Sequence, residues 1–303
     1  MDKKELLSEY VAPTVVPALE KQISDTLKRA GIYHRIFSRA KTPYSVLEKI
    51  DRKGYPTKEG KILQDIIGIR IALYFVDDVA ICRQIVEEIF ETVGTEATEL
   101  NPKIFAPERL NIVCKIPEDH IKYFRADLWS NFPVDKTFEV QIRTVFSEGW
   151  HEIEHDVRYK SESDWNAQPD LSRNLNGILA TLETCDWSII SILDDLAYRE
   201  YKNKEWAEMM KNKLRIHLVD ATLDENIIGV FNSHPNVAKS FFRIDRKSLL
   251  VFLSCEMKRS IPLTLSNIIY ISNFLWIKDE KIIGFTPKVL KDIFARFGIN
   301  HQT

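Results

Sequence analysis

The sequence has few cysteines, no long apolar run and no excess of positive charge. Its four cysteines lie far apart without a C-x-x-C pair, which argues against a disulfide framework or a cysteine-based zinc site. No apolar run approaches the ~20 residues of a membrane span, and the N-terminus lacks an apolar signal core. Lys and Arg total 42 against 44 for Asp and Glu, so no general basic field is available to hold nucleic acid. We therefore expect a cytoplasmic protein that does not bind membranes.

A chain of 303 residues with 45% apolar and 28% charged residues is typical of a folded protein with one large or two modest domains. Apolar spacing indicates helix and strand in alternation, which favours an α/β or α+β class. We expect helices over 6–32 (interrupted by Pro13 and Pro17), 45–50, 79–90 and 145–159, and strands over 66–75, 110–116 and 137–143.

The second half of the chain reads as helices separated by prolines and carries no chemical motif. We place a domain boundary near residue 200, which gives a first domain over 1–200 and a helical region over 201–303. That helical region is expected to regulate the first domain, form a homo-oligomer or bind a partner.

The strongest local signal is the segment 138–144, in which polar and apolar residues alternate. Alternation places Glu139, Gln141 and Arg143 on one face of a strand and three apolar residues on the other. The polar face is either equipped for a ligand or simply faces solvent, and the segment alone favours solvent.

A second signal is a group of cations around the expected start of a short helix. Arg39, Lys41 and Lys49 lie there with the hydroxyl of Ser45. Cations near a helix N-terminus oppose the helix dipole unless an anion sits there, so the group suits a polyphosphate. The alternative is a solvated basic face with Thr42 or Ser45 as the N-cap.

A third signal is a pair of charges that border a strand of buried character, Asp65 and Arg70. Buried charges require partners. The two residues would face opposite sides of a regular strand, so either Asp65 precedes the strand or Gly68 marks a bulge. The sequence leaves both possibilities open.

These three segments, in this order, resemble the synthetase domain of the RelA/SpoT family, in its small single-synthetase type. The matching patterns are R-x-K-x-x-x-S…K, D-x-x-G-x-R and E-x-Q-I-R-T, and the resemblance covers roughly residues 20–200. It implies an α+β fold, a mixed β-sheet flanked by helices. The family's following helix pattern is present as Trp150, Glu154, His155, Tyr159 and Lys160.

The resemblance implies an ATP site. By position, Arg39 and Arg70 would sandwich the adenine, since guanidinium planes stack well on bases. Lys41, Ser45 and Lys49 would hold the phosphates. The reaction implied is transfer of the β,γ-diphosphate of ATP to a ribose 3′-hydroxyl, with release of AMP.

The resemblance also implies a magnesium site and a catalytic base. Asp65 and Glu139 would hold Mg²⁺, for which carboxylate oxygens are suitable ligands, and Glu139 would take the proton from the attacking hydroxyl. Supporting residues would be Gln141, Arg143, Glu154 and His155.

The segment that would bind the acceptor departs from the family pattern. Pro107, Arg109 and Asn111 stand where the family has Tyr, Ser and His, so the stacking of that Tyr on guanine is missing unless Phe105 supplies it. The family's acceptor, GDP or GTP, is the first expectation. Alternatives are an adenine nucleotide or the 3′ end of tRNA, in a toxin or defence role, or an inactive nucleotide-binding module.

One further pattern, H-E-x-x-H, is typical of zinc proteases. His151, Glu152 and His155 fit it, because two histidines one helical turn apart can share a zinc ion. No clear third ligand follows in the sequence, and the residues coincide with the helix of the RelA/SpoT pattern. We interpret the match as chance.

Overall fold

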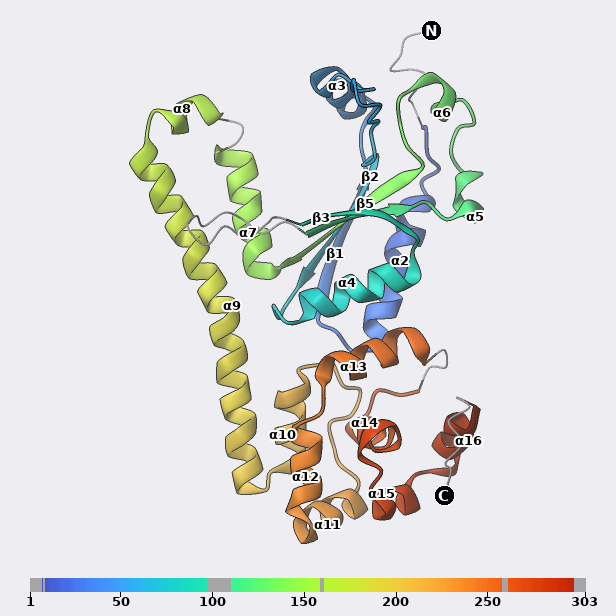
Figure 1. Ribbon diagram of the computed structural model, residues 1–303, viewed down its shortest axis with the longest axis vertical. Helices are drawn as coiled ribbons and strands as arrows, with labels where there is room; N and C mark the ends of the chain where they lie inside the picture. Colours follow the sequence, from blue (N-terminus) through green and yellow to red (C-terminus); the bar gives the residue numbers. More distant parts are fainter. Residues whose placement is uncertain (1–6, 8, 98–109, 159–160, 258–260, 297–303) are drawn as a thin grey trace. The chain divides into compact units, whose positions relative to one another are not determined.

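The computed structural model gives the fold shown in Figure 1. No helix in the described part of the chain combines the length and the apolar character needed to span a membrane. The residues that the structure describes are 7, 9–97, 110–158, 161–257 and 261–296.

The contacts divide the chain into two compact units. Unit 1 comprises Met1–Leu27 and His34–Trp187, and unit 2 comprises Lys28–Tyr33 and Ser188–Thr303. The boundary that we place near residue 200 lies inside one long helix, α9 (Pro169–Asn203), and stays a prediction.

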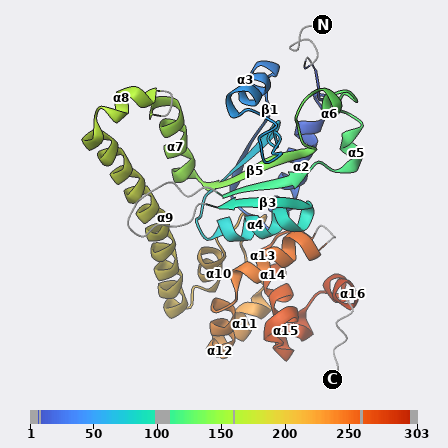
Figure 2. The same cartoon turned by 45° about the horizontal axis from the view of Figure 1, so that its top comes forward.

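A five-stranded sheet in the order β1-β2-β5-β4-β3 organises unit 1 (Figure 2). β2 and β5 run parallel, whereas the other three neighbouring pairs run antiparallel. The sheet is therefore mixed, and the predicted α+β class is confirmed. The strands are β1 (His34–Ala40), β2 (Ile67–Leu73), β3 (Thr92–Ala97), β4 (Leu110–Lys115) and β5 (Thr137–Thr144).

Three of these strands match the predicted ones, and the two edge strands were not predicted. β1 carries Arg35 and Arg39 on an exposed face, and β3 contains Gly94. Edge strands bury little and tolerate charge and glycine, so they lack the apolar density on which the sequence analysis depended.

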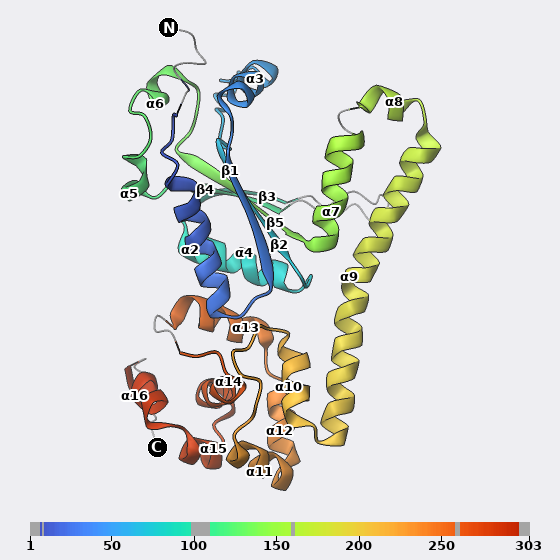
Figure 3. The ribbon, with the colours of Figure 1, turned by 180° about the vertical axis from the view of Figure 1, so that it is seen from behind.

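Two helices cover the apolar face of the sheet. They are α2 (Val15–Arg29) and α4 (Asp78–Ile89), which lie together on one side of the strands in Figures 1 and 3, with α7 (Val145–Ile153) on the other. Glu20 of α2 accepts a hydrogen bond from Ser38 of β1. Phe90, after α4, packs edge-on against Phe138 with ring centroids 5.1 Å apart. Residues buried on this face include Ile69, Ile71, Val140 and Ile142.

The N-terminal helix is shorter than predicted. We expected helix from residue 6, but α2 begins at Val15, because Pro13 interrupts the pattern. Tyr10 therefore lies before the helix, where its hydroxyl donates to the carbonyls of Lys41 (2.9 Å) and Ile66 (3.1 Å).

α3 (Pro43–Lys53) follows the end of β1 and α7 follows the end of β5, and each helix begins at a threonine cap. α3 starts after Thr42, whose hydroxyl accepts from the amide of Ser45 at 3.2 Å. α7 (Val145–Ile153) starts after Thr144, which caps it in the same way. The predicted helix over 145–159 continues from α7 as a π-helical segment, η1 (Glu154–Arg158).

Unit 1 also contains shorter helices around the sheet, and α9 begins in it. They are α5 (Glu118–Ile121), α6 (Leu128–Asn131) and α8 (Glu162–Asn166).

Unit 2 is helical in its described part, as predicted for the second half of the chain. Its core contains Trp206 and Phe231 in an edge-on pair, and a stacked pair of Phe274 and Phe294. Its elements after α9 are α10 (Trp206–Leu214), α11 (Glu225–Ser233), α12 (Pro235–Phe242), α13 (Arg246–Val251), η3 (Phe252–Glu256), α14 (Leu265–Ser272), η4 (Asn273–Ile277), α15 (Glu280–Phe285) and α16 (Lys288–Arg296).

The segment Lys28–Tyr33 belongs to unit 2 and packs within it through Gly31. Gly31 adopts φ +69°, and its carbonyl accepts a hydrogen bond from the amide of His217 at 2.7 Å. A Cβ at this position would lie 2.6 Å from a methyl group of Leu263, so only glycine fits here.

Candidate active site

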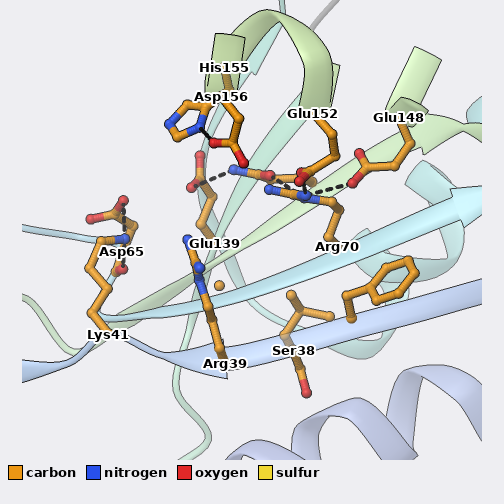
Figure 4. Close-up of a pocket in the computed structure, with 14 residues that line it drawn as sticks. Ser38, Arg39, Lys41, Asp65, Arg70, Glu139, Glu148, Glu152, His155 and Asp156 are labelled. Carbon is orange, nitrogen blue, oxygen red and sulfur yellow. Dashed lines mark hydrogen bonds and ion pairs between the residues drawn. The ribbon is translucent and has the colours of Figure 1, made fainter. Parts of the chain in front are cut away.

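The polar face of the sheet holds a pocket of about 660 Å³ (Figure 4). Side chains from β1, β2, β5, α7 and η1 line it, together with the segments that join β1 to α3 and lead into β2. The predicted site residues among its lining are Arg39, Lys41, Asp65, Arg70, Glu139, Gln141 and His155.

Strand register brings these residues together from distant parts of the sequence. Neighbours in register share a face of the sheet, so each row across the strands presents its side chains to the same pocket. One row consists of Arg39, Gly68 and Glu139. The next row consists of Phe37, Arg70, Gln141 and Asn111.

Asp65 forms ion pairs with two of the predicted lysines, Lys41 and Lys49. β2 begins at Ile67, so Asp65 precedes the strand, which answers the question that the sequence left open. The Lys41 ammonium donates to Asp65 Oδ2 at 2.8 Å and to the Asp65 carbonyl at 2.7 Å. Lys49 reaches the same Oδ2 at 2.5 Å from α3. The other carboxylate oxygen, Asp65 Oδ1, is buried and has no hydrogen-bond partner.

The charges of this cluster separate the pKa values of its two carboxyl groups. Burial raises the pKa of Glu139, and the neighbouring charge of Asp65 raises it further. Burial acts in the same direction on Asp65, but Lys41 and then Lys49 outweigh it and lower the pKa of Asp65. Burial lowers the pKa of Lys41 despite the attraction of Asp65. Asp65 is thus held as an anion, while Glu139 binds a proton more readily.

A buried tyrosine fixes the chain around this cluster. The hydroxyl of Tyr10 bridges the carbonyls of Lys41 and Ile66, and the amide of Lys41 donates to Ile66 at 2.8 Å. These bonds tie the end of β1 to the start of β2. From sequence Tyr10 falls only within the helix predicted over 6–32, because the partners of its hydroxyl lie 31 and 56 residues further along the chain.

Arg70 is the centre of a second cluster in the pocket. Its Nε donates to Gln141 Oε1 at 3.2 Å, and its Nη1 donates to Glu148 Oε1 at 2.5 Å and to Glu152. Gln141 in turn donates to Glu139 Oε2 at 3.2 Å. The two clusters are therefore linked across the sheet.

Four predicted residues do not line the pocket. Ser45 and Lys49 belong to α3, where the Ser45 hydroxyl lies 3.0 Å from that of Thr42. Arg143 lies two residues after Gln141 on β5, and its Nη1 donates to Glu148 Oε2 at 2.9 Å. Glu154 pairs with Arg158 at 3.3 Å, away from the pocket.

The altered acceptor segment is described only in part. Phe105, Pro107 and Arg109 lie outside the described residues, as do Tyr159 and Lys160 of the following helix pattern. Asn111 is on β4 beside Gln141, and its Oδ1 is buried without a hydrogen-bond partner.

The H-E-x-x-H residues do not form a common site. The exposed fraction is 4% for His151, which packs edge-on against Trp150, and 62% for the side chain of His155, which contacts Asp156. Among the described residues no group of three or more His, Cys, Asp or Glu side chains is arranged to hold a metal ion.

The structure adds pocket residues that the sequence analysis did not select. Glu148 and Glu152 are the most significant, because both bind Arg70. They lie four residues apart in a predicted helix and so on one face, which is the signal that could have found them. Phe37, Ser38, Gly68, Ile69 and Asp156 also line the pocket.

Comparison with known proteins finds similarity over this part of the chain. Residues 38–164 match the family described as "Region found in RelA / SpoT proteins". GTP pyrophosphokinase YjbM of Bacillus subtilis (strain 168) is 30% identical over 127 residues, covering 41% of this chain and 56% of that protein. GTP pyrophosphokinase YwaC of the same organism is 28% identical over 135 residues, covering 42% of this chain and 59% of that protein.

Among solved structures, the crystal structure of the small alarmone synthetase 1 from Bacillus subtilis is similar to this chain. It has 23% identity and a TM-score of 0.48, and covers 62% of this chain and 94% of that chain. The sequence matches to the two curated relatives span only 56% and 59% of their lengths.

Proposed function

We propose that this chain, whose residues 38–164 match the family described as "Region found in RelA / SpoT proteins", is an ATP-dependent pyrophosphokinase. It transfers the β,γ-diphosphate of ATP to the 3′-hydroxyl of GDP or GTP, which makes (p)ppGpp. The observation that carries the proposal is the cluster in which Lys41 and Lys49 pair with Asp65, because Asp65 and Lys41 line the pocket that also contains Glu139. Cations for phosphates, a fixed anion and a basic carboxylate are the groups that this transfer requires.

In this proposal the nucleotide lies on the polar face of the sheet, over β1 and β2, which pair at one edge. Arg39 of β1 and Arg70 of β2 line the pocket from neighbouring strands, and the adenine stacks between their guanidinium planes. Lys41 and Lys49 turn from Asp65 to the phosphates. The Ser45 hydroxyl, at the start of α3, adds a further donor.

The donor atoms suit Mg²⁺. Asp65 Oδ1 is buried without a hydrogen-bond partner, and the Glu139 carboxylate lines the same pocket. Two carboxylates are a usual protein contribution to a magnesium site, because the nucleotide phosphates and water supply the remaining oxygens. Asp65 and Glu139 would hold the ion, which would supply positive charge beside the transferring phosphates.

Glu139 acts as the general base. Burial and the charge of Asp65 raise the pKa of its carboxyl group, which makes it a stronger proton acceptor at neutral pH. The 3′-oxygen attacks the β-phosphorus, Glu139 takes the hydroxyl proton, and the bond from the β-phosphorus to the bridging α,β-oxygen breaks. AMP leaves with the electron pair of that bond. Gln141, which donates to Glu139, keeps the carboxylate in position.

A second acceptor class is supported by one residue of the described site. Asn111 has a buried, unpaired carbonyl oxygen where the family pattern has His. Such an oxygen accepts a hydrogen bond from a base amino group, and the exocyclic amine of adenine satisfies it as well as that of guanine. An adenine nucleotide or the 3′ end of tRNA is therefore the alternative acceptor.

The test is transfer of label from β,γ-labelled ATP in the presence of Mg²⁺. GDP, GTP, ADP, ATP or deacylated tRNA is added separately, and AMP and the labelled product are measured. Label on GDP or GTP supports (p)ppGpp synthesis, and label on adenine nucleotides or tRNA alone supports the second acceptor class. Glu139→Gln should reduce AMP release by about 10²–10⁴-fold, the usual contribution of a general base. Activity of that variant equal to wild type would contradict the mechanism.

A further inference from the structure

A carboxylate on α7, Glu148, joins two arginines beside the pocket. We propose that Glu148 is a positioning residue that fixes the plane of Arg70 for stacking on the adenine. This inference rests on the proposed function, since it requires ATP to lie between Arg39 and Arg70.

Both oxygens of Glu148 are used. Oε1 accepts from Arg70 Nη1 at 2.5 Å, and Oε2 accepts from Arg143 Nη1 at 2.9 Å. The side chains of Glu148 and Arg143 are only 11% and 9% exposed, so water competes little for these bonds. Charge-assisted hydrogen bonds of this kind are among the strong ones, and two of them fix the orientation of the carboxylate.

The backbone places Glu148 for this purpose. It lies in the first turn of α7, where the helix dipole favours a carboxylate. That turn is held by Thr144, whose hydroxyl accepts from the amide of Ser147 at 3.0 Å and donates to Asp186 at 2.7 Å. The position of Glu148 is therefore set by the start of its helix rather than by Arg70.

The contacts of Arg70 lie in the plane of its guanidinium group. Nε donates to Gln141 and Nη1 to Glu148, and both N–H directions lie within that plane. Bonds at the edge of the group fix its orientation and leave its faces available for stacking. Figure 4 shows Glu148 and Glu152 beside the guanidinium of Arg70.

Glu152 provides an internal comparison. It also pairs with Arg70, but its side chain is 55% exposed, against 11% for Glu148. Solvent weakens such a pair. If positioning depends on the buried contact, removing the charge of Glu148 has a much larger effect than removing that of Glu152.

The experiment measures the Kd of AMPCPP, a non-hydrolysable ATP analogue, by calorimetry with Mg²⁺ for the full chain. Glu148→Gln should raise Kd about tenfold, as loss of a hydrogen bond between charged groups does. Glu152→Gln should raise it at most about threefold. Glu87→Gln is the matched control, because Glu87 pairs with Arg83 on α4, on the other face of the sheet, and should leave Kd unchanged. In the transfer reaction with ATP and acceptor, Glu148→Gln should raise the KM for ATP by a larger factor than it lowers kcat.

A double-mutant cycle separates positioning from general stability. In an Arg70→Ala background, Glu148→Gln should change Kd less than about twofold, because the group that it positions is gone. Glu148→Asp, which keeps the charge with a shorter reach, should also raise Kd and serves if Glu148→Gln does not fold.

Three results would overturn the inference. They are an unchanged Kd in folded Glu148→Gln or Glu148→Asp, an equal effect of Glu152→Gln, and full additivity with Arg70→Ala. Wild-type protein that does not bind AMPCPP would instead reject the proposed function, and this inference with it.

Discussion

Replacement of Asp65 by Asn should strengthen nucleotide binding in the absence of divalent cations and weaken it in their presence. Lys41 and Lys49 lie 2.8 and 2.5 Å from Asp65 Oδ2, so this carboxylate neutralises the ammonium groups that we assign to the phosphates. Without a metal ion, Asp65 also repels the phosphates that approach these lysines. With Mg²⁺, the same carboxylate becomes a ligand and its removal costs affinity.

The magnitude follows from the separation of the charges. A phosphate oxygen that takes over both ammonium groups would lie on the order of 5 Å from Asp65, about two hydrogen-bond lengths. Two unit charges at that distance repel by about 3 kcal/mol at an effective dielectric constant of 20. Salt and solvent reduce this, so we expect about 1–2 kcal/mol, or a Kd lowered by about 5–30-fold in EDTA.

The assay is calorimetric titration with AMPCPP in EDTA and again in Mg²⁺. Asp25→Asn is the matched control, since Asp25 pairs with Lys21 on the opposite side of the sheet and its loss changes the net charge equally. A folded Asp65→Asn protein that binds AMPCPP in EDTA no more tightly than wild type would refute the reasoning. An equal gain in Asp25→Asn would show that net charge alone is responsible.

Three further predictions concern stability. Gly31→Ala should lower the stability of unit 2 by about 2–4 kcal/mol, because φ is positive and the Cβ meets Leu263. Gly229→Ala on α11, where a Cβ has no atom within 4 Å, should raise the stability of unit 2 by about 0.5–1 kcal/mol. Equal Tm values for the wild type and the two glycine variants would contradict both of these predictions. Burial raises the pKa of the Asp186 carboxyl group in the folded protein, although the hydrogen bond from Thr144 opposes this. The free energy of unfolding is therefore highest below the pKa of Asp186 in the unfolded chain, where the group is protonated in both states. It falls as pH rises through the higher pKa of the folded state. Asp186→Asn should therefore raise Tm at pH 7 more than at pH 4, and an equal shift at both would refute this.

The central strands could be predicted from sequence because they are buried on at least one face. β2 and β5 each present several fully buried residues, such as Ile69 and Val140. β1 was missed because its exposed residues include Phe37 and Arg39, so its pattern resembles a basic loop. Its strand conformation depends on pairing with β2, which local propensity does not contain.

Most residues of the site could be named in advance, but their partners could not. The predicted Asp65 and Glu139 line one pocket, whereas Glu148 was overlooked although it binds both Arg70 and Arg143. The parallel register of β2 and β5 places Arg70 beside Gln141, and Glu148 reaches Arg70 from α7, so both contacts join segments far apart in the sequence and cannot be derived from local spacing. The π-helical turn after α7 was likewise not predictable from spacing, because it departs from the period of an α-helix.

The segment Lys28–Tyr33 gives the two units an unusual connectivity. It belongs to unit 2 by its contacts, although the chain before and after it belongs to unit 1. Unit 2 is therefore assembled from two separate stretches of sequence, and the chain passes between the units three times. A single cut near Trp187 would leave Gly31 and Tyr33 behind without the residues that they pack against. Transfer of the whole helical unit to another protein would thus require three junctions in the sequence rather than one.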